Sequence, residues 1–141
     1  GVYSNTAIRR GIDNTPKDEQ LNNMELVANE VFEPLRDWVD GPIKINSFFR
    51  SPDLNTAIGG SHKSQHCKGQ AIDIDDVFNR ATNAEMYHFI KDNLDFDQII
   101  WEFGNDDNPD WVHVSYVSED DNRRRCLKAY KENNKTKYKV I

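Results

Sequence analysis

The stretch from Ser64 to Asp73, SQHCKGQAID, constrains the fold and chemistry of this chain more than any other. It places His66 and Asp73 seven residues apart, with Gly69 between them. The run Ala71–Asp75 alternates small or acidic residues with isoleucine, which favours a loop leading into a strand over a helix. We therefore expect His66 to lie on the loop and Asp73 to point towards it from the strand. One imidazole and one carboxylate make up half of a zinc site.

A second histidine follows forty residues after Asp73, in the segment DWVHVS at residues 110–115. Strand alternation would put His113 on one face together with Trp111 and Ser115. Three protein ligands, His66, Asp73 and His113, would leave the fourth position of a tetrahedral zinc ion open, which is typical of catalytic zinc sites.

This pattern resembles that of the zinc D-Ala-D-Ala peptidases of the M15 group, which cut peptidoglycan stem peptides. The motif Ser-x-His-x-x-Gly-x-Ala-x-Asp is formed by Ser64, His66, Gly69, Ala71 and Asp73, and Asp-x-x-His by Asp110 and His113. Upstream, the segment SFFRSP at residues 47–52 is similar to the family's Ser-Gly-Tyr-Arg-Ser segment, and Asn55 with Gly59-Gly60 continues the match. The similarity extends over roughly residues 13–117.

The resemblance implies one zinc ion per chain, bound by His66, Asp73 and His113. It also implies that Asp110 is the general base, because a carboxylate near the metal can accept the proton of the attacking water. Arg50 would bind the peptide or carboxylate of the substrate through its planar, permanently charged fork, although a salt bridge with one of the many acids is the alternative.

Further residues are candidates for contact with substrate. Ser64 would orient a ligand or a substrate oxygen, and His62 would line the cleft. Glu102 is the alternative base, and Trp101 lies beside it; the competing interpretation is that both are ordinary strand residues. Phe48-Phe49 replaces the family's Gly-Tyr before Arg50, which removes a phenol from the site.

The order of predicted elements indicates an α+β fold with an antiparallel sheet and flanking helices. The resemblance implies that this is the hedgehog/DD-peptidase fold. Thr15-Pro16 would start a helix of about six turns. Its buried stripe, at spacings of three and four residues, would be Leu21, Met24, Ala28, Val31, Leu35 and Trp38. A capping box at Thr82 and Glu85 predicts a later helix, and strands are expected near residues 43–47, 70–75, 96–103, 111–117, 126–130 and 137–141.

Length and charge suggest one domain over residues 1–141, with an irregular lead-in at 1–14 and a basic C-terminal hairpin at 122–141. The net charge is -6, yet residues 122–141 contain eight Lys or Arg and one Glu. This hairpin either is simply solvated or adheres to an anionic wall polymer. We expect a monomer that binds peptidoglycan, without nucleic acid or membrane insertion.

Two cysteines, Cys67 and Cys126, are too few for a disulfide framework. A bridge between them is left open. Cys67 follows a predicted ligand directly, but adjacent residues rarely direct both side chains to one ion, so a small buried apolar role is favoured.

The resemblance therefore implies a zinc-dependent hydrolase that cuts a peptide bond in peptidoglycan stem peptides or cross-links, as a carboxypeptidase or endopeptidase. A phage endolysin is the expected setting: a protein made in the cytoplasm without a visible export signal, which acts at the bacterial wall or periplasm after delivery by a holin or virion. The alternatives are a zinc-stabilised binding module without catalysis and a virion structural protein on the same fold.

Overall fold

A computed structural model describes residues 14–58 and 64–141. It contains a six-stranded sheet with helices against it, so the expected α+β fold is confirmed. The strands are β1 Lys44–Ser47, β2 Ala71–Asp75, β3 Gln98–Glu102, β4 Trp111–Ser115, β5 Arg125–Glu132 and β6 Lys135–Val140.

The strands lie in the order β1-β2-β4-β3-β5-β6, so β4 lies between two strands that precede it in the chain. All neighbours are antiparallel except β3 and β5, which run parallel. The expectation of an antiparallel sheet is therefore correct for most of the sheet and wrong for this pair. Because β4 ends level with the start of β3, residues 116–124 need only pass that end of β3 before β5 enters the sheet parallel to it.

The first described helix consists of three consecutive segments: α2 Asp18–Val27, the π-helical turn η1 Ala28–Phe32, and α3 Glu33–Val39. It begins later than the predicted start at Thr15, and the backbone N–H of Lys17 donates to the Gln20 side chain at 2.7 Å. The predicted buried stripe is only partly correct, because Leu21 and Trp38 are exposed. The buried stripe is Val27, Val31, Leu35 and Val39, whose regular spacing of four residues suits the wider π turn.

Two of the remaining helices begin at residues that cap them, and the second cap was predicted. Helix α4, Pro52–Ala57, follows Ser51, whose hydroxyl accepts from the Leu54 N–H at 3.2 Å. Helix α5, Asn83–Asn93, begins with the capping box between Thr82 and Glu85. These local signals were readable because each depends on residues within one turn.

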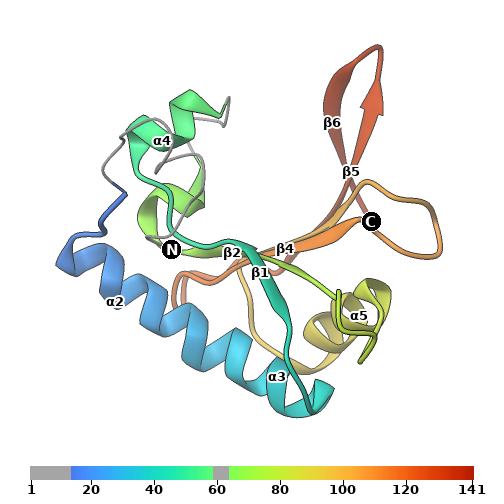
Figure 1. Ribbon diagram of the computed structural model, residues 1–141, viewed down its shortest axis with the longest axis horizontal. Coiled ribbons are helices and arrows are strands. Elements are labelled where there is room, and N and C mark those ends of the chain that lie inside the picture. Colours follow the sequence, from blue (N-terminus) through green and yellow to red (C-terminus); the bar gives the residue numbers. More distant parts are fainter. Residues whose placement is uncertain (1–13, 59–63) are drawn as a thin grey trace.

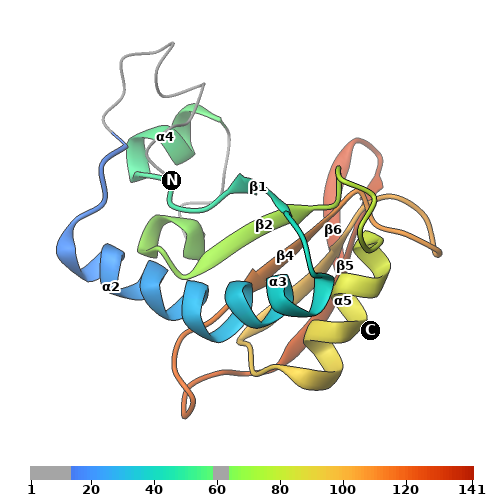
Figure 2. The ribbon, with the colours of Figure 1, turned by 60° about the horizontal axis from the view of Figure 1, so that its bottom comes forward.

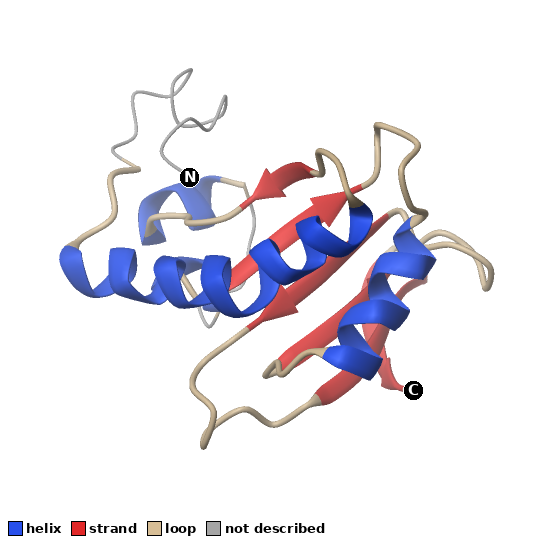
Figure 3. Ribbon diagram, turned by 90° about the horizontal axis from the view of Figure 1, so that it is seen from below, coloured by secondary structure: helices blue, strands red, loops and turns tan. Residues whose placement is uncertain are grey.

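Helices α2, α3 and α5 cover one face of the sheet, where the main core lies (Figures 2 and 3). Alternation along β3 sends Ile99 and Trp101 into this core and leaves Ile100 and Glu102 on the opposite face. On that opposite face, α4 and the β5–β6 hairpin rise on either side of the sheet (Figure 1). None of the helices in the described ranges is long and apolar enough to cross a bilayer.

Candidate metal centre

The antiparallel register of β2 and β4 places Asp73 directly opposite His113. The His113 Nδ1 atom lies 3.0 Å from Asp73 Oδ1, and both side chains are mostly shielded from solvent. The predicted alternation of the two strands accounts for this pair, since each strand directs these residues to the face away from the main core.

His66 reaches the same carboxylate from η2, a 3-10 helix at Gln65–Lys68, rather than from an irregular loop. Its Nδ1 lies 2.7 Å from the carbonyl oxygen of Phe48, and a carbonyl can only accept, so Nδ1 carries the proton. In the neutral ring, Nε2 is then a lone-pair atom, and it lies 3.2 Å from Asp73 Oδ2. It is buried and has no hydrogen-bond partner among the residues that the structure describes. Two facing electron-pair donors call for a cation between them.

The electrostatics of the three groups favour the protonation states that metal binding needs. Burial lowers the pKa of His66, and this effect exceeds the opposing influence of Asp73. Burial would raise the pKa of Asp73, but the neighbouring His113 and His66 imidazoles outweigh it and hold that pKa well below its ordinary value. A neutral imidazole and an ionised carboxylate are the forms that ligate zinc.

The donor atoms of His66, Asp73 and His113 all lie within 4.8 Å of one another. With zinc–ligand bonds of about 2.0–2.1 Å in a tetrahedron, neighbouring donors are separated by roughly 3.3 Å. The two contacts to Asp73 are close to this value, and the donor set is one that zinc accepts. The residues present therefore fit a zinc ion, as the sequence predicted.

Two side chains of helix α2 donate hydrogen bonds to backbone carbonyls of η2 and fix its position. The Gln20 side chain donates to the carbonyl of Cys67 at 3.1 Å, and that of Asn23 donates to the carbonyl of Lys68 at 2.8 Å. Gly69 ends η2 at φ +73°, and a Cβ there would lie 2.5 Å from the Gln20 carbonyl oxygen. This position needs glycine both for its backbone conformation and for the close approach of α2.

The three metal-binding candidates lie in a cleft of about 890 Å³ on the open face of the sheet. Its described lining comes from the η2 region, from β3 and β4, and from the β5–β6 hairpin: Arg50, Ser64, Gln65, His66, Lys68, Asp73, Gln98, Ile100, Glu102, Phe103, Trp111, His113, Arg123, Arg125, Leu127, Lys131, Thr136 and Tyr138.

A family model described as peptidase M15 matches residues 2–115, most of the chain. This chain belongs to the peptidase M15 family. It is therefore a metallopeptidase in general terms, and the His66, Asp73 and His113 group could bind the metal ion on which such zinc-dependent peptidases rely. A comparison with curated proteins finds none that matches.

In this M15 peptidase, Glu102 lies at the end of β3 on the cleft side. It is 7% exposed, and burial raises its pKa to about 7, with His113 opposing the shift and Asp73 adding to it. Its backbone partner is Trp111, and the partner of His113 is Ile100, so Glu102 lies diagonally across from His113 on one sheet face. A carboxylate whose pKa is close to neutral is suited to proton transfer.

The structure places two sequence candidates elsewhere. Trp101 is buried in the main core against Tyr87, because it alternates with Glu102, and its indole N–H donates to the Asn105 carbonyl at 3.0 Å. Asp110 is exposed and is absent from the described lining of the cleft. It directly precedes β4, and its backbone N–H donates to the Glu102 carbonyl at 2.9 Å. The described lining of the cleft therefore contains Glu102 but not Asp110.

Arg50 and Ser64 lie in the cleft, as expected. The Arg50 guanidinium donates to the Ser64 hydroxyl at 3.4 Å, and its buried Nε finds no hydrogen-bond partner among the described residues. The Ser64 hydroxyl also accepts from the His66 N–H at 3.2 Å, so it caps η2. His62 lies outside the described residues. Cys67 and Cys126 are both free thiols, and neither belongs to the metal-binding group.

The part of the cleft lining that comes from the β5–β6 hairpin was not predicted from the sequence. The sequence placed Trp111 on the face of His113, and the same alternation would have placed Gln98 on the face of Glu102. The hairpin residues Lys131 and Tyr138 could not be predicted, since nothing local shows that β5 pairs with β3.

Proposed function

We propose that this chain hydrolyses a peptide bond in peptidoglycan stem peptides or cross-links, with one zinc ion bound by His66, Asp73 and His113. The observation that carries the proposal is the facing pair of His66 Nε2 and Asp73 Oδ2 at 3.2 Å, in a cleft that also contains a buried carboxylate. Family membership supports the metallopeptidase class, and the substrate is our inference from it.

Zinc bound at this site would polarise the scissile carbonyl and lower the pKa of a water molecule. Glu102 is the residue that we assign as general base. It accepts a proton from the attacking water and passes it to the amine that leaves, so that atoms and charge balance in the products, an acid and an amine. Its burial keeps competing solvent away and sets its pKa near the working pH.

Arg50 supports substrate binding. Its guanidinium lies in the cleft beside Ser64 with hydrogen-bonding capacity to spare among the described residues. A guanidinium can donate hydrogen bonds to a peptide carbonyl, and it can donate two parallel hydrogen bonds to one carboxylate. We assign to it the orientation of the stem peptide. The setting that we propose is a phage endolysin or a related wall peptidase, made in the cytoplasm and acting at the bacterial wall.

The test is a digestion of purified peptidoglycan, with zinc content measured on the same protein. We expect one zinc per chain and new peptide termini in the mass spectrum of the released fragments, and a chelator should abolish them. The positions of the termini identify the bond and separate carboxypeptidase from endopeptidase activity.

His66→Ala supplies the matched control, because it removes one ligand from the cleft. It should lose both zinc and cleavage. Stoichiometric zinc without cleavage of any wall type would overturn the proposal and favour a binding module.

A further inference from the structure

The β5–β6 hairpin forms one wall of the cleft, although the match to the family model ends at residue 115, before the hairpin begins. Figure 1 shows the hairpin standing opposite α4 above the open face of the sheet. Five hairpin residues line the cleft: Arg125, Leu127, Lys131, Thr136 and Tyr138. Family membership therefore does not extend to this wall of the cleft. The ligand that the wall binds is inferred from the wall's own residues.

The cleft is cationic within an acidic protein. Its described lining includes five Arg or Lys residues but only two acids, Asp73 and Glu102, whereas the whole chain has a net charge of -6. Asp73 already serves the metal centre. Such a local excess of positive charge attracts anionic ligands and concentrates them at the site.

Two of these cations belong to the hairpin and are not neutralised. Neither Arg125 nor Lys131 forms an ion pair with a carboxylate within the described ranges, whereas the outward-facing Lys128 and Lys137 pair with Asp106 and Glu132. The Lys131 ammonium donates to Thr136 Oγ1 at 2.9 Å and lies 5.4 Å from the centre of the Phe103 ring. These contacts hold the ammonium and leave two of its three N–H donors for a ligand.

The two cations lie on opposite sides of the metal centre along the strand direction. In the sheet register, Leu127 and His113 are both level with Ile100, so Leu127 marks the level of the metal centre on β5. Arg125 lies two residues before it, level with Gln98. Lys131 lies four residues beyond Leu127, past the end of β3. A peptide that extends along the wall would therefore meet one cation before the metal centre and the other after it.

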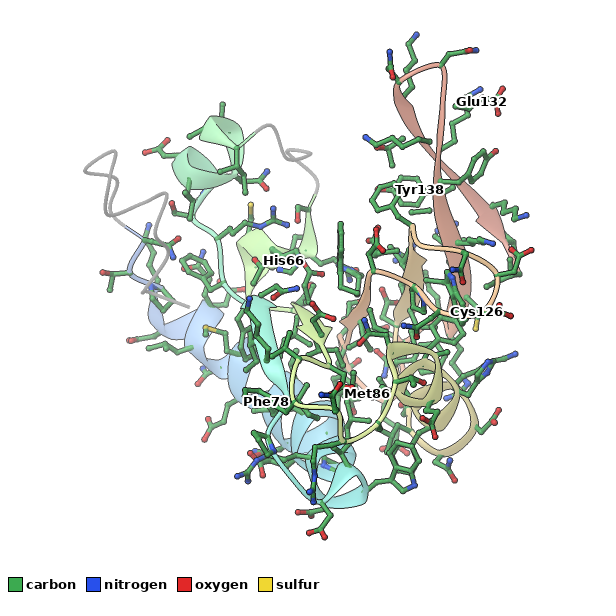
Figure 4. The ribbon with its side chains drawn as sticks, turned by 45° about the vertical axis from the view of Figure 1, so that its right-hand side comes forward. His66, Phe78, Met86, Cys126, Glu132 and Tyr138 are labelled. Carbon is green, nitrogen blue, oxygen red and sulfur yellow. The ribbon has the colours of Figure 1, made fainter. Side chains whose placement is uncertain are left out.

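Tyr138 completes the wall near the centre. Its cross-strand partner is Ala129, whose small side chain leaves space for the ring, and Figure 4 shows the Tyr138 side chain on the side of the hairpin where His66 lies. Burial and the negative charges of Glu102 and Asp73 raise the pKa of its phenol, so the phenol stays a hydrogen-bond donor.

We propose that the hairpin selects acidic peptides with carboxylates on both sides of the scissile bond, one bound by Arg125 and the other by Lys131. The proposal rests on the proposed function for the position of the scissile bond. It names the substrate class, a diacidic extended peptide, and assigns its recognition to a wall that the family match does not include.

The test measures binding by calorimetry, so that it does not depend on turnover. Zinc-loaded protein carrying Glu102→Gln, which keeps the peptide intact, is titrated with a synthetic stem-type peptide that has one carboxylate on each side of the bond. Two further peptides each have one of these carboxylates amidated. We expect each amidation to weaken binding about fivefold, as for a partly exposed ion pair.

Lys131→Gln and Arg125→Gln, each added to the Glu102→Gln background, assign the carboxylates. Each variant should weaken binding of the diacidic peptide about fivefold and should become insensitive to amidation of one carboxylate, a different one for each variant. Lys139→Gln is the matched control, because it removes the same charge from the same hairpin on the outward face. It should leave the affinity within twofold.

Equal losses in Lys139→Gln and Lys131→Gln would show a general charge effect and would overturn the proposal. So would equal affinity for the diacidic and amidated peptides. If the selective binding is found while protein with Glu102 intact cleaves no wall, the proposed function fails, and what stands is the binding of two peptide carboxylates by Arg125 and Lys131. If the wall is cleaved but the diacidic and amidated peptides bind equally well, the proposed function stands and the hairpin proposal fails.

Discussion

At the scale of single residues, Glu102 and Asp110 offer two carboxylates for one catalytic role. The chain motif favours Asp110, because it precedes His113 at the family spacing. The structure favours Glu102, which is buried in the cleft with a raised pKa of about 7, while Asp110 is exposed and is not part of the described cleft lining. The choice between them decides which strand, β3 or β4, carries the base.

We predict that Glu102→Gln lowers kcat by a factor of about 10²–10⁴, because the amide keeps the shape of the side chain and cannot accept the proton. Zinc content should be unchanged, since Glu102 is not one of the three ligands. Steady-state hydrolysis of a stem peptide, with metal analysis of the same samples, measures both quantities.

Asp110→Asn is the comparison variant. It should keep kcat within about twofold, because its side chain lies outside the cleft lining. A large loss of kcat in Asp110→Asn together with normal activity in Glu102→Gln would reverse the assignment of the base.

At the scale of elements, Asp97 joins η2 to the segment that leads into β5. It is 1% exposed and accepts from the Arg123 backbone N–H at 3.0 Å and from its guanidinium at 3.0 and 2.8 Å. The Gln65 side chain donates to the same carboxylate at 2.9 Å. One buried anion therefore fixes both the helix that carries His66 and the start of the cleft wall.

We predict that Asp97→Asn destabilises the fold by about 2 kcal/mol at pH 7, because charge-assisted hydrogen bonds are lost. Burial would raise the pKa of Asp97, but the hydrogen bonds from Arg123 and Gln65 lower it overall. Its stabilising contribution is therefore complete above the ordinary carboxyl pKa of about 4 and is lost as the pH falls further.

Urea unfolding of both proteins measures this dependence. The gap in unfolding free energy should be constant from about pH 7 to 5 and should narrow below about pH 4. A gap that stayed constant through the acid range would mean that the carboxylate charge of Asp97 does not contribute. Asp95→Asn, a nearby acid that is partly exposed, is the control.

The sequence predicted those elements whose signals are local. The Thr82 and Glu85 box, the alternation around Asp73 and the alternation around His113 all depend on neighbours within a few residues, and the structure has them. The π turn at Ala28–Phe32 has no comparable signal, so the predicted buried stripe is correct at Val31 and Leu35 and wrong at its two ends, Leu21 and Trp38. The parallel pairing of β3 and β5 depends on which sheet edge is free, and that is a property of the whole fold.

The same distinction applies to the site. The three metal-binding candidates were predictable because each lies in a short motif. Alternation alone would have set Glu102 on the face of His113 and Trp101 on the other, once β3 and β4 were paired. The Asp-x-x-His motif instead predicts Asp110 as the base.

At the scale of the whole molecule, the metal centre joins parts of the chain that are far apart in sequence, so metal binding should stabilise the entire fold. We predict that free zinc at about 100 times its dissociation constant adds about 2.7 kcal/mol. For a domain of this size that is a rise of roughly 8 °C in Tm. Differential scanning calorimetry with zinc and with chelator measures the shift.

Asp73→Asn should abolish most of this zinc-dependent shift, because Asp73 contacts both histidines. Asp110→Asn should retain it. An unchanged Tm on addition of zinc to the parent protein would contradict a structural contribution of the metal.

The position of β4 has a consequence for the order of events during synthesis. This strand is made after β2 and β3 but lies between them in the sheet. Because β2 and β3 do not pair with each other, neither has β4 as its neighbour until the ribosome has added Trp111–Ser115. Its arrival closes the sheet and brings His113 to Asp73 in the same step. A nascent chain therefore acquires its metal late and all at once, and zinc uptake on refolding should have the same rate constant as closure of the sheet.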